Sequence, residues 1–201
     1  IGASSDHYFV EDMKNPNMPD YKLYVFLATH ALGDEKRQYI KKKLAKNKAV
    51  VLWMYAPVFI NPDKSNKMSE EYIEDITGIK VKMLMEVHGS KFKITSDNNI
   101  VKELDKGHIY GRIDKRMFCN INIREEMPSY LCPVFYVDDD EAQVLGRFCG
   151  LNLPALAVKR LEDFTSIYCG AKVVQSEVIR SIAKYAGVHL YSNENDVIYS
   201  N

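Results

Sequence analysis

The chain has 201 residues, of which 46% are hydrophobic, and its 27 Lys and Arg residues balance 27 Asp and Glu residues. This length and composition predict one or two globular domains, each with a hydrophobic core. The even charge gives no general attraction to nucleic acid or to an anionic membrane, and no apolar run approaches the roughly 20 residues that cross a bilayer. We therefore expect neither nucleic acid nor a membrane as partner.

The first part of the chain predicts a strand, a helix and a second strand. Residues 21–28 are rich in the β-branched and aromatic side chains that favour a strand. Residues 34–45 have the spacing of an amphipathic helix, whose lysines at 41–43 are expected to form a solvated face. Residues 49–55 are apolar without alternation, as in a parallel strand that is covered on both faces. Together these elements predict a βαβ unit.

The rest of the chain predicts two helices and several short strands. Ser69 is expected to begin a short helix that Gly78 ends, and residues 176–186 have the clearest helical pattern. From 86 to 122 polar turns interrupt short apolar pieces, which we interpret as an excursion from the main fold. Strands are expected at 79–85, 133–137, 144–148, 155–159, 165–168, 188–191 and 196–200. Without repeats, residues 1–201 are interpreted as a single α/β domain.

The cysteines and histidines give no sign of a metal or redox centre. Neither a CxxC pair nor an HExxH or HxH spacing is present among Cys119, Cys132, Cys149 and Cys169 or the five histidines. The sequence therefore predicts no metal site and no cofactor.

Five residues are candidates for ligand binding: Asp12, Tyr55, Asp138, His189 and Tyr191. Asp138 follows a predicted strand and should lie at the carboxyl edge of the sheet, where open α/β sheets bind ligands; a turn carboxylate in solvent is the alternative. His189 and Tyr191 should project from one face of a strand, where they could hold a sugar or pack against a helix. An enzyme built on Asp12, Asp138 and His189 would need all three at one pocket.

Four segments, 21–26, 50–57, 76–79 and 186–191, carry a resemblance to a known family. The sequence resembles the domain that follows the catalytic barrel in bacterial β-galactosidase-like glycoside hydrolases, the trimerisation domain, which has the fold of class I glutamine amidotransferases. The resemblance implies a three-layer, flavodoxin-like α/β fold with a mostly parallel sheet and helices on both faces. Val58 stands where such proteins usually have Gly, so a tight turn at this point is in question.

The resemblance also implies a role. In this fold a first strand and helix normally precede the segment at Asp6–Asp12, so the chain is expected to be a piece of a longer polypeptide that carries its barrel upstream. Amidotransferases of this fold need a Cys on the turn after the strand that ends at Tyr55, and no Cys, Ser or Thr follows there before Ser65. We therefore expect no catalysis by this chain alone.

The expected function is that of an accessory or oligomerisation domain. Its partners would be the catalytic barrel of the same protein, a second copy of the chain, or both, and the resemblance favours an extracytoplasmic location in a bacterium. A carbohydrate-binding module is the alternative, and an enzyme with a site at the carboxyl edge is a further one. A carbohydrate module requires an open aromatic groove, whereas Trp53, in an apolar strand, is expected to belong to the core.

Overall fold

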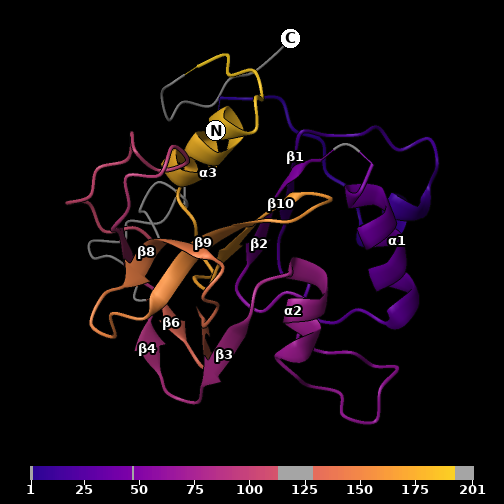
Figure 1. Ribbon diagram of the computed structural model, residues 1–201, viewed down its shortest axis with the longest axis horizontal. Coiled ribbons are helices and arrows are strands. Elements are labelled where there is room, and N and C mark those ends of the chain that lie inside the picture. The colour runs from indigo at the N-terminus through magenta and orange to yellow at the C-terminus, as the bar shows by residue number, and fades with distance from the viewer. Residues whose placement is uncertain (1, 47, 113–128, 193–201) are drawn as a thin grey trace, which may run out of the picture.

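The computed structural model describes residues 2–46, 48–112 and 129–192. Its centre is a six-stranded sheet in the order β1-β2-β10-β9-β8-β5 (Figure 1). The strands of this sheet are β1 (Leu23–Phe26), β2 (Val50–Met54), β5 (Phe92–Ile94), β8 (Gln143–Phe148), β9 (Pro154–Arg160) and β10 (Thr165–Cys169). The predicted strands at 21–28, 49–55, 144–148, 155–159 and 165–168 are thus confirmed within one or two residues at most ends.

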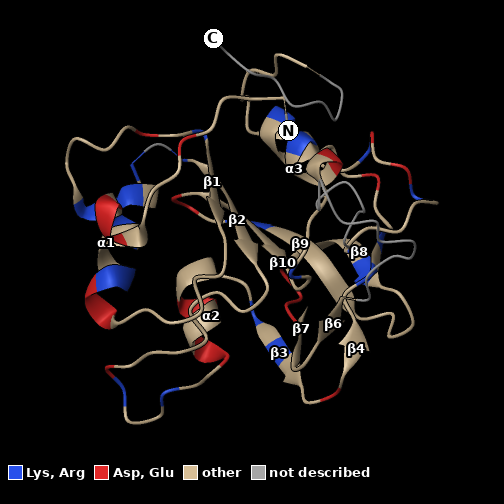
Figure 2. Ribbon diagram, turned by 180° about the vertical axis from the view of Figure 1, so that it is seen from behind, with Lys and Arg blue, Asp and Glu red and all other residues tan. Residues whose placement is uncertain are grey.

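The sheet joins a parallel half to an antiparallel half. β2 pairs in parallel with β1 and with β10, whereas β10, β9, β8 and β5 pair in antiparallel order. Helices α1 (Asp34–Leu44) and α2 (Glu71–Thr77) cover one face, and α3 (Ser176–Tyr185) covers the other (Figures 1 and 2). The predicted three-layer α/β fold is confirmed, with parallel pairing confined to β1, β2 and β10.

The buried strand β2 separates two hydrophobic cores. Val51 and Trp53 pack with α1 and α2, and Leu52 and Met54 pack toward α3. Trp53 is fully buried, stacks on Phe26 at 4.4 Å between ring centroids, and donates its indole hydrogen to Ser166 at 3.1 Å. Because both faces of β2 are covered, its residues are apolar without alternation. Trp53 is a core residue and offers no surface to a sugar.

Two small antiparallel sheets extend the fold. β3 (Val81–Leu84) pairs with β7 (Val134–Val137), and β4 (His88–Gly89) pairs with β6 (Tyr130–Leu131). The 3-10 helix η1 (Val10–Lys14) packs against α1. Figure 1 shows β3, β4 and β6 at the end of the molecule away from α3. Among the helices in the described ranges, none has the length and apolar character needed to cross a bilayer.

The segment interpreted as an excursion contributes to the core. Within residues 86–112, β5 joins the edge of the main sheet, and Phe92, Ile100 and Tyr110 are buried in the α3-side core. Short strands and turns replace the longer periodic pattern here, so sequence periodicity underestimates the order of this segment. Residues 113–122 of the predicted excursion lie outside the described residues.

Three expectations for segments in or after the helices were wrong or lie outside the described residues. Residues 188–191 are not a strand but an irregular segment after α3, which ends where Gly187 adopts φ 73°. The partner strand expected at 196–200 lies outside the described residues. Lys43 is buried rather than solvated, since its ammonium group donates to the carbonyl of Met18 and pairs with Asp20, both at 2.6 Å.

Candidate functional site

The carboxyl ends of β1, β2 and β10 meet around Tyr55. This residue follows β2 in a left-handed conformation, at φ 63°. Its amide donates to the carbonyl of Cys169 at 2.7 Å, and its own carbonyl accepts the phenol hydrogen of Tyr168. A bulky residue rarely adopts a positive φ, because its Cβ crowds the backbone, so these contacts from β10 hold the turn in place.

The side chain of Tyr55 fills the space at this edge. Its hydroxyl donates to the carbonyl of Pro133 at 2.7 Å. Its ring lies edge-on to the rings of His30 and Phe135, with centroids 5.8 Å and 5.5 Å away. His30 in turn places Nδ1 3.2 Å from the carbonyl oxygen of Ala56. The candidate residue Tyr55 is therefore half-buried and engaged on every side within the domain.

This arrangement is poorly suited to nucleophilic chemistry. Burial raises the pKa of Tyr55 above its usual 10, and burial also raises the pKa of the nearby Cys169 thiol to about 12. Both groups therefore stay protonated at neutral pH, and a thiol must ionise to attack. Pro57, next in the turn, has no amide hydrogen with which to stabilise an oxyanion.

The turn that Val58 put in question is present. Val58 adopts φ 56°, the region that a glycine would enter without strain, and it is fully buried. Its amide donates to the carbonyl of Thr29 at 2.7 Å, which ties the turn to the loop after β1. Its carbonyl accepts from the guanidinium of Arg37 at 2.6 Å. The departure from Gly thus changes the side chain without opening the backbone turn.

Arg37 is a structural residue that the sequence pattern did not reveal. It lies on α1 with 4% of its surface exposed and also donates to the carbonyls of Leu32 and Tyr72, at 3.0 Å and 2.9 Å. Its guanidinium lies 5.0 Å from the centroid of the Tyr72 ring. One side chain therefore joins α1, α2 and the turn after β2, which positions the carboxyl edge.

In the acidic turn after β7, the enclosed and paired carboxylate is Asp139 rather than the predicted Asp138. Asp138 itself is exposed and pairs with Lys82 at 2.7 Å, on the small β3–β7 sheet rather than the main sheet. Asp139 is the more enclosed carboxylate and pairs with Lys159 at 2.9 Å. Burial alone would raise the pKa of Asp139, but hydrogen bonds from Lys159 and from the amides of Lys80 and Glu141 outweigh it and lower that pKa.

The structure holds the other predicted site residues in separate surroundings. The carboxylate of Asp12 accepts the amide of Phe9 at 2.8 Å and caps η1. His189 and Tyr191 are brought together, with ring centroids 4.7 Å apart, but in the segment after α3 and with Tyr191 mostly exposed. Asp12, Asp138 and His189 thus lie on different elements with different partners. Within the described residues no group of three His, Cys, Asp or Glu side chains is arranged to hold a metal ion.

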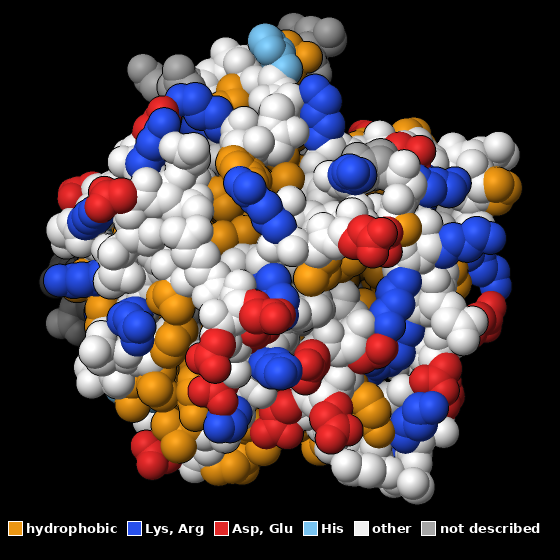
Figure 3. Space-filling view, in the orientation of Figure 1, with side chains coloured by type: hydrophobic (Ala, Val, Ile, Leu, Met, Phe, Trp, Pro, Cys, Tyr) orange, Lys and Arg blue, Asp and Glu red, His pale blue; other side chains and the backbone are white. Residues whose placement is uncertain are grey.

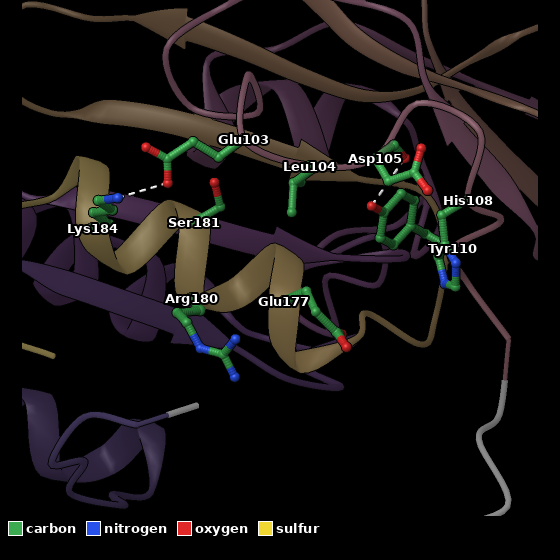
Figure 4. A pocket seen from close by; sticks show the side chains of 9 residues that line it. All are labelled: Glu103, Leu104, Asp105, His108, Tyr110, Glu177, Arg180, Ser181 and Lys184. Carbon is green, nitrogen blue, oxygen red and sulfur yellow. Dashed lines mark hydrogen bonds and ion pairs between the residues drawn. The ribbon is translucent and has the colours of Figure 1, made fainter. Parts of the chain in front are cut away.

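A polar cavity of about 470 Å³ lies between α3 and residues 103–110 (Figure 4). Glu103 and Lys184 form an ion pair at 2.6 Å at one end, and the phenol of Tyr110 donates to the carbonyl of Asp105 at the other, at 3.1 Å. Ser181 donates to the carbonyl of Ile100 at 2.5 Å. Most of the polar groups here are therefore already paired within the domain.

An apolar surface lies on the β4–β6 sheet. Gly89 pairs with Tyr130, so the two share a face with Val87, whereas His88 and the buried Leu131 occupy the other face. Val87 is 68% exposed and Tyr130 57%, and Met85, two residues before Val87 in the chain, is 70% exposed. We call Met85, Val87 and Tyr130 the β4–β6 apolar face. Figure 3 shows hydrophobic side chains gathered at this end of the molecule.

Comparisons with known proteins reveal the fold but no sequence family. No protein-family model matches the sequence, and the search of curated proteins found no match. The β-galactosidase of Bacillus circulans sp. alkalophilus matches 88% of this chain with a TM-score of 0.57 and 13% identity. That of the haloarchaeon Halorubrum lacusprofundi matches 88% with a TM-score of 0.51 and 16% identity. A GMP synthase component from Thermoplasma acidophilum matches 89% of this chain and 76% of its own, with a TM-score of 0.49 and 9% identity.

The two β-galactosidases are much longer than this chain, which spans 24% of each. Their likeness therefore concerns one segment of those enzymes. The chain has the α/β fold of a domain that makes up about a quarter of these β-galactosidase chains.

Proposed function

We propose that this chain is a non-catalytic accessory domain of a β-galactosidase-like glycoside hydrolase and that it serves in assembly. The observation that carries the proposal is the match of 88% of this chain to 24% of the Bacillus circulans β-galactosidase. Since the matched segment is only about a quarter of that enzyme, the remaining three quarters of its chain can contain the catalytic residues. The partners of this chain would be the catalytic barrel, a second copy of the domain, or both.

The carboxyl edge supports a non-catalytic role. Tyr55 stands at the left-handed position after β2, and its hydroxyl, amide and carbonyl all have partners within the domain. A reactive group at such a turn has to be free to meet its substrate. The carboxyl edge is instead filled by a packed aromatic side chain.

The β4–β6 apolar face supports a role in assembly. Exposed apolar residues that lie together mark contact surfaces more often than isolated ones do. Met85, Val87 and Tyr130 are each more than half exposed; Tyr130 lies on β6, and Met85 and Val87 lie in the segment that leads into β4. A stable contact would bury roughly 1,000 Å² or more in total, so this face would form the centre of a larger interface.

Two measurements test the proposal. The chain is incubated with nitrophenyl β-galactoside and, separately, with glutamine, and we expect no turnover above the buffer blank; turnover that survives repurification contradicts a non-catalytic role. Sedimentation velocity over a concentration series is expected to show a defined dimer or trimer at the higher concentrations. A strict monomer at every concentration would exclude self-assembly and leave only the barrel as partner.

The cavity beside α3 favours a second candidate function, the binding of a sugar. Its lining contains the carboxylates of Glu103 and Asp105 and the hydroxyl of Ser181. Each already has a partner within the domain, but a carboxylate or hydroxyl oxygen can accept a second hydrogen bond, here from a sugar hydroxyl. Calorimetric titration with galactose and with lactose tests this candidate. Saturable heat that is lost in Glu103→Gln supports sugar binding, and no heat with either sugar removes it.

A further inference from the structure

The cavity beside α3 carries more negative than positive charge. Among the described residues, its lining has three carboxylates and two cationic side chains: Glu103, Asp105 and Glu177 against Arg180 and Lys184. Glu103 and Lys184 pair with each other at 2.6 Å. When the charge of Arg180 is counted against that of Glu177, the lining keeps one negative charge, that of Asp105. A ligand that brings one positive charge would therefore complement the cavity.

Asp105 has a carboxylate oxygen without a partner in the described part of the chain. Its Oδ1 accepts the amide of Gly107 at 2.7 Å. The neighbouring Lys106 pairs with Asp97 instead, at 2.6 Å, so Asp105 forms no ion pair with the lysine next to it. Oδ2 of Asp105 is therefore available to accept a hydrogen bond from a ligand.

The cavity also offers apolar surface and a hydroxyl. The half-buried ring of His108 lies edge-on to the buried ring of Tyr110, with centroids 4.8 Å apart, and Leu104 also lines the cavity. The C–H groups of a pyranose ring pack on surfaces of this kind. Figure 4 shows Asp105 at the same end as His108 and Tyr110, and Ser181 toward the opposite end. A charged acceptor and a hydroxyl thus lie at opposite ends of one small cavity.

We propose that this cavity binds an amino sugar, with the ammonium group of the sugar at Asp105 and its hydroxyls toward Ser181 and Glu103. A carboxylate accepts a stronger, charge-assisted hydrogen bond from an ammonium than from a neutral hydroxyl. The volume of about 470 Å³ lies in the range of about 300–1,000 Å³ that is usual for small-molecule sites. This inference rests on the second candidate function, sugar binding at this cavity, and names the chemical class of the sugar.

The test compares three sugars that differ at one position. Galactosamine carries a protonated amine near pH 6, below the ordinary pKa of an α-amino group, about 7.7–8.0. Galactose has a hydroxyl in that place, and the nitrogen of N-acetylgalactosamine is uncharged. The amide signals of the 201-residue chain are followed by nuclear magnetic resonance at low ionic strength while each sugar is added. We expect saturable shifts within residues 103–110 and 177–184, and about fivefold tighter binding of galactosamine than of the other two.

The outcomes separate the ligand class from sugar binding itself. Equal affinity for galactosamine and galactose would overturn the amino-sugar inference and leave sugar binding in place. If none of the three sugars gives saturable shifts in these residues, sugar binding and the inference both fail. Ethanolamine is added alone to test whether the ammonium suffices. An affinity equal to that of galactosamine would also overturn the proposal, because the sugar hydroxyls would then contribute nothing.

Two variants provide a matched pair of charge removals. Asp105→Asn keeps the oxygen that accepts the amide of Gly107 but loses the charge, so the preference for galactosamine over galactose should disappear. Asp163→Asn removes an exposed charge from the turn between β9 and β10, outside the cavity, and should keep the preference. A preference that persists in Asp105→Asn would overturn the assignment of the ammonium to Asp105.

Discussion

The phenol of Tyr168 donates its hydrogen bond to the backbone carbonyl of Tyr55, the residue that leaves β2 in a left-handed conformation. Tyr168 lies on β10 and is fully buried, so its hydroxyl has no access to water in the fold. Burial raises the pKa of Tyr168 well above 10, which keeps the hydroxyl protonated as a donor. A central strand thus holds the turn at the carboxyl edge through one hydrogen bond.

Replacing Tyr168 by Phe removes this donor and leaves the carbonyl of Tyr55 buried without it. We expect Tyr168→Phe to lower the free energy of unfolding by about 1–3 kcal/mol, measured by urea denaturation. Tyr39→Phe is the control, because the half-buried Tyr39 hydroxyl has no hydrogen bond among the described residues. An unchanged urea midpoint for Tyr168→Phe would show that this bond does not stabilise the turn.

Substitutions of Val58 test whether the backbone of the same turn is strained. Within a regular helix or strand, a variant with Gly is less stable than the variant with Ala, by roughly 0.5–1 kcal/mol. At φ 56° the order is expected to reverse, because Gly relieves about 1–2 kcal/mol of left-handed strain that Ala retains. Both variants lose apolar contacts, so both should be less stable than the native chain.

The measurement for Val58 is again urea unfolding, with Val51 as control. Val51 is equally buried but lies within the regular strand β2. We expect Val58→Gly to be more stable than Val58→Ala, and Val51→Gly to be less stable than Val51→Ala. The same order at both positions would contradict a left-handed Val58.

Arg37 connects three segments that precede or form the carboxyl edge. An ammonium group cannot match the planar guanidinium that donates to Leu32, Val58 and Tyr72, so Arg37→Lys should be severely destabilising. We expect a loss of about 3 kcal/mol or more in thermal or urea unfolding, since buried carbonyls lose their donors. Lys42→Arg, on the exposed side of α1, should leave stability nearly unchanged. A loss below about 1 kcal/mol in Arg37→Lys would refute the anchoring role.

The next prediction is that Asp139 makes the stability of the fold depend on pH in the acidic range. Hydrogen bonds that outweigh burial lower the pKa of Asp139 below its ordinary 3.8 in the fold. Its stabilising contribution is therefore fully present above pH 3.8 and is lost as the pH falls through the lower folded value. The stability difference between the native chain and Asp139→Asn should be largest near neutral pH and shrink in acid.

The matched control is Asp138→Asn, which alters an exposed ion pair with Lys82. Such pairs contribute about 0–1 kcal/mol, so this variant should track the native chain closely at all pH values. The free energy of unfolding is measured for all three proteins from neutral pH to about pH 3. A pH-independent difference between Asp139→Asn and the native chain would exclude the proposed linkage.

Periodicity predicted the main sheet well because its strands are long and buried. Residues 49–55 are apolar without alternation since β2 has a core on each face, and that pattern identified the strand. The helices α1 and α3 were likewise predicted within about one residue of their ends. The same rule missed β5, whose three residues are too few to form a period.

Site residues were harder to predict, because contacts distant in sequence decide them. The buried pairing of Lys43 depends on Met18 and Asp20, which lie far earlier in the chain, and no helical pattern reveals it. The choice between Asp138 and Asp139 depends on Lys159, on the neighbouring strand β9. Tyr55 was predicted as the end of a strand and as a candidate binding residue, but its partners on β10 and before β7 became visible only in the fold.

The central claim, assembly through the β4–β6 apolar face, is tested most directly by light scattering of matched variants. Tyr130→Lys and Val87→Lys place a charge on that face, and Met68→Lys places one on a similarly exposed methionine elsewhere. The native chain and Met68→Lys are expected to associate to the same defined mass as concentration rises, whereas Tyr130→Lys and Val87→Lys remain monomeric. One common mass for all four proteins at every concentration would contradict the account.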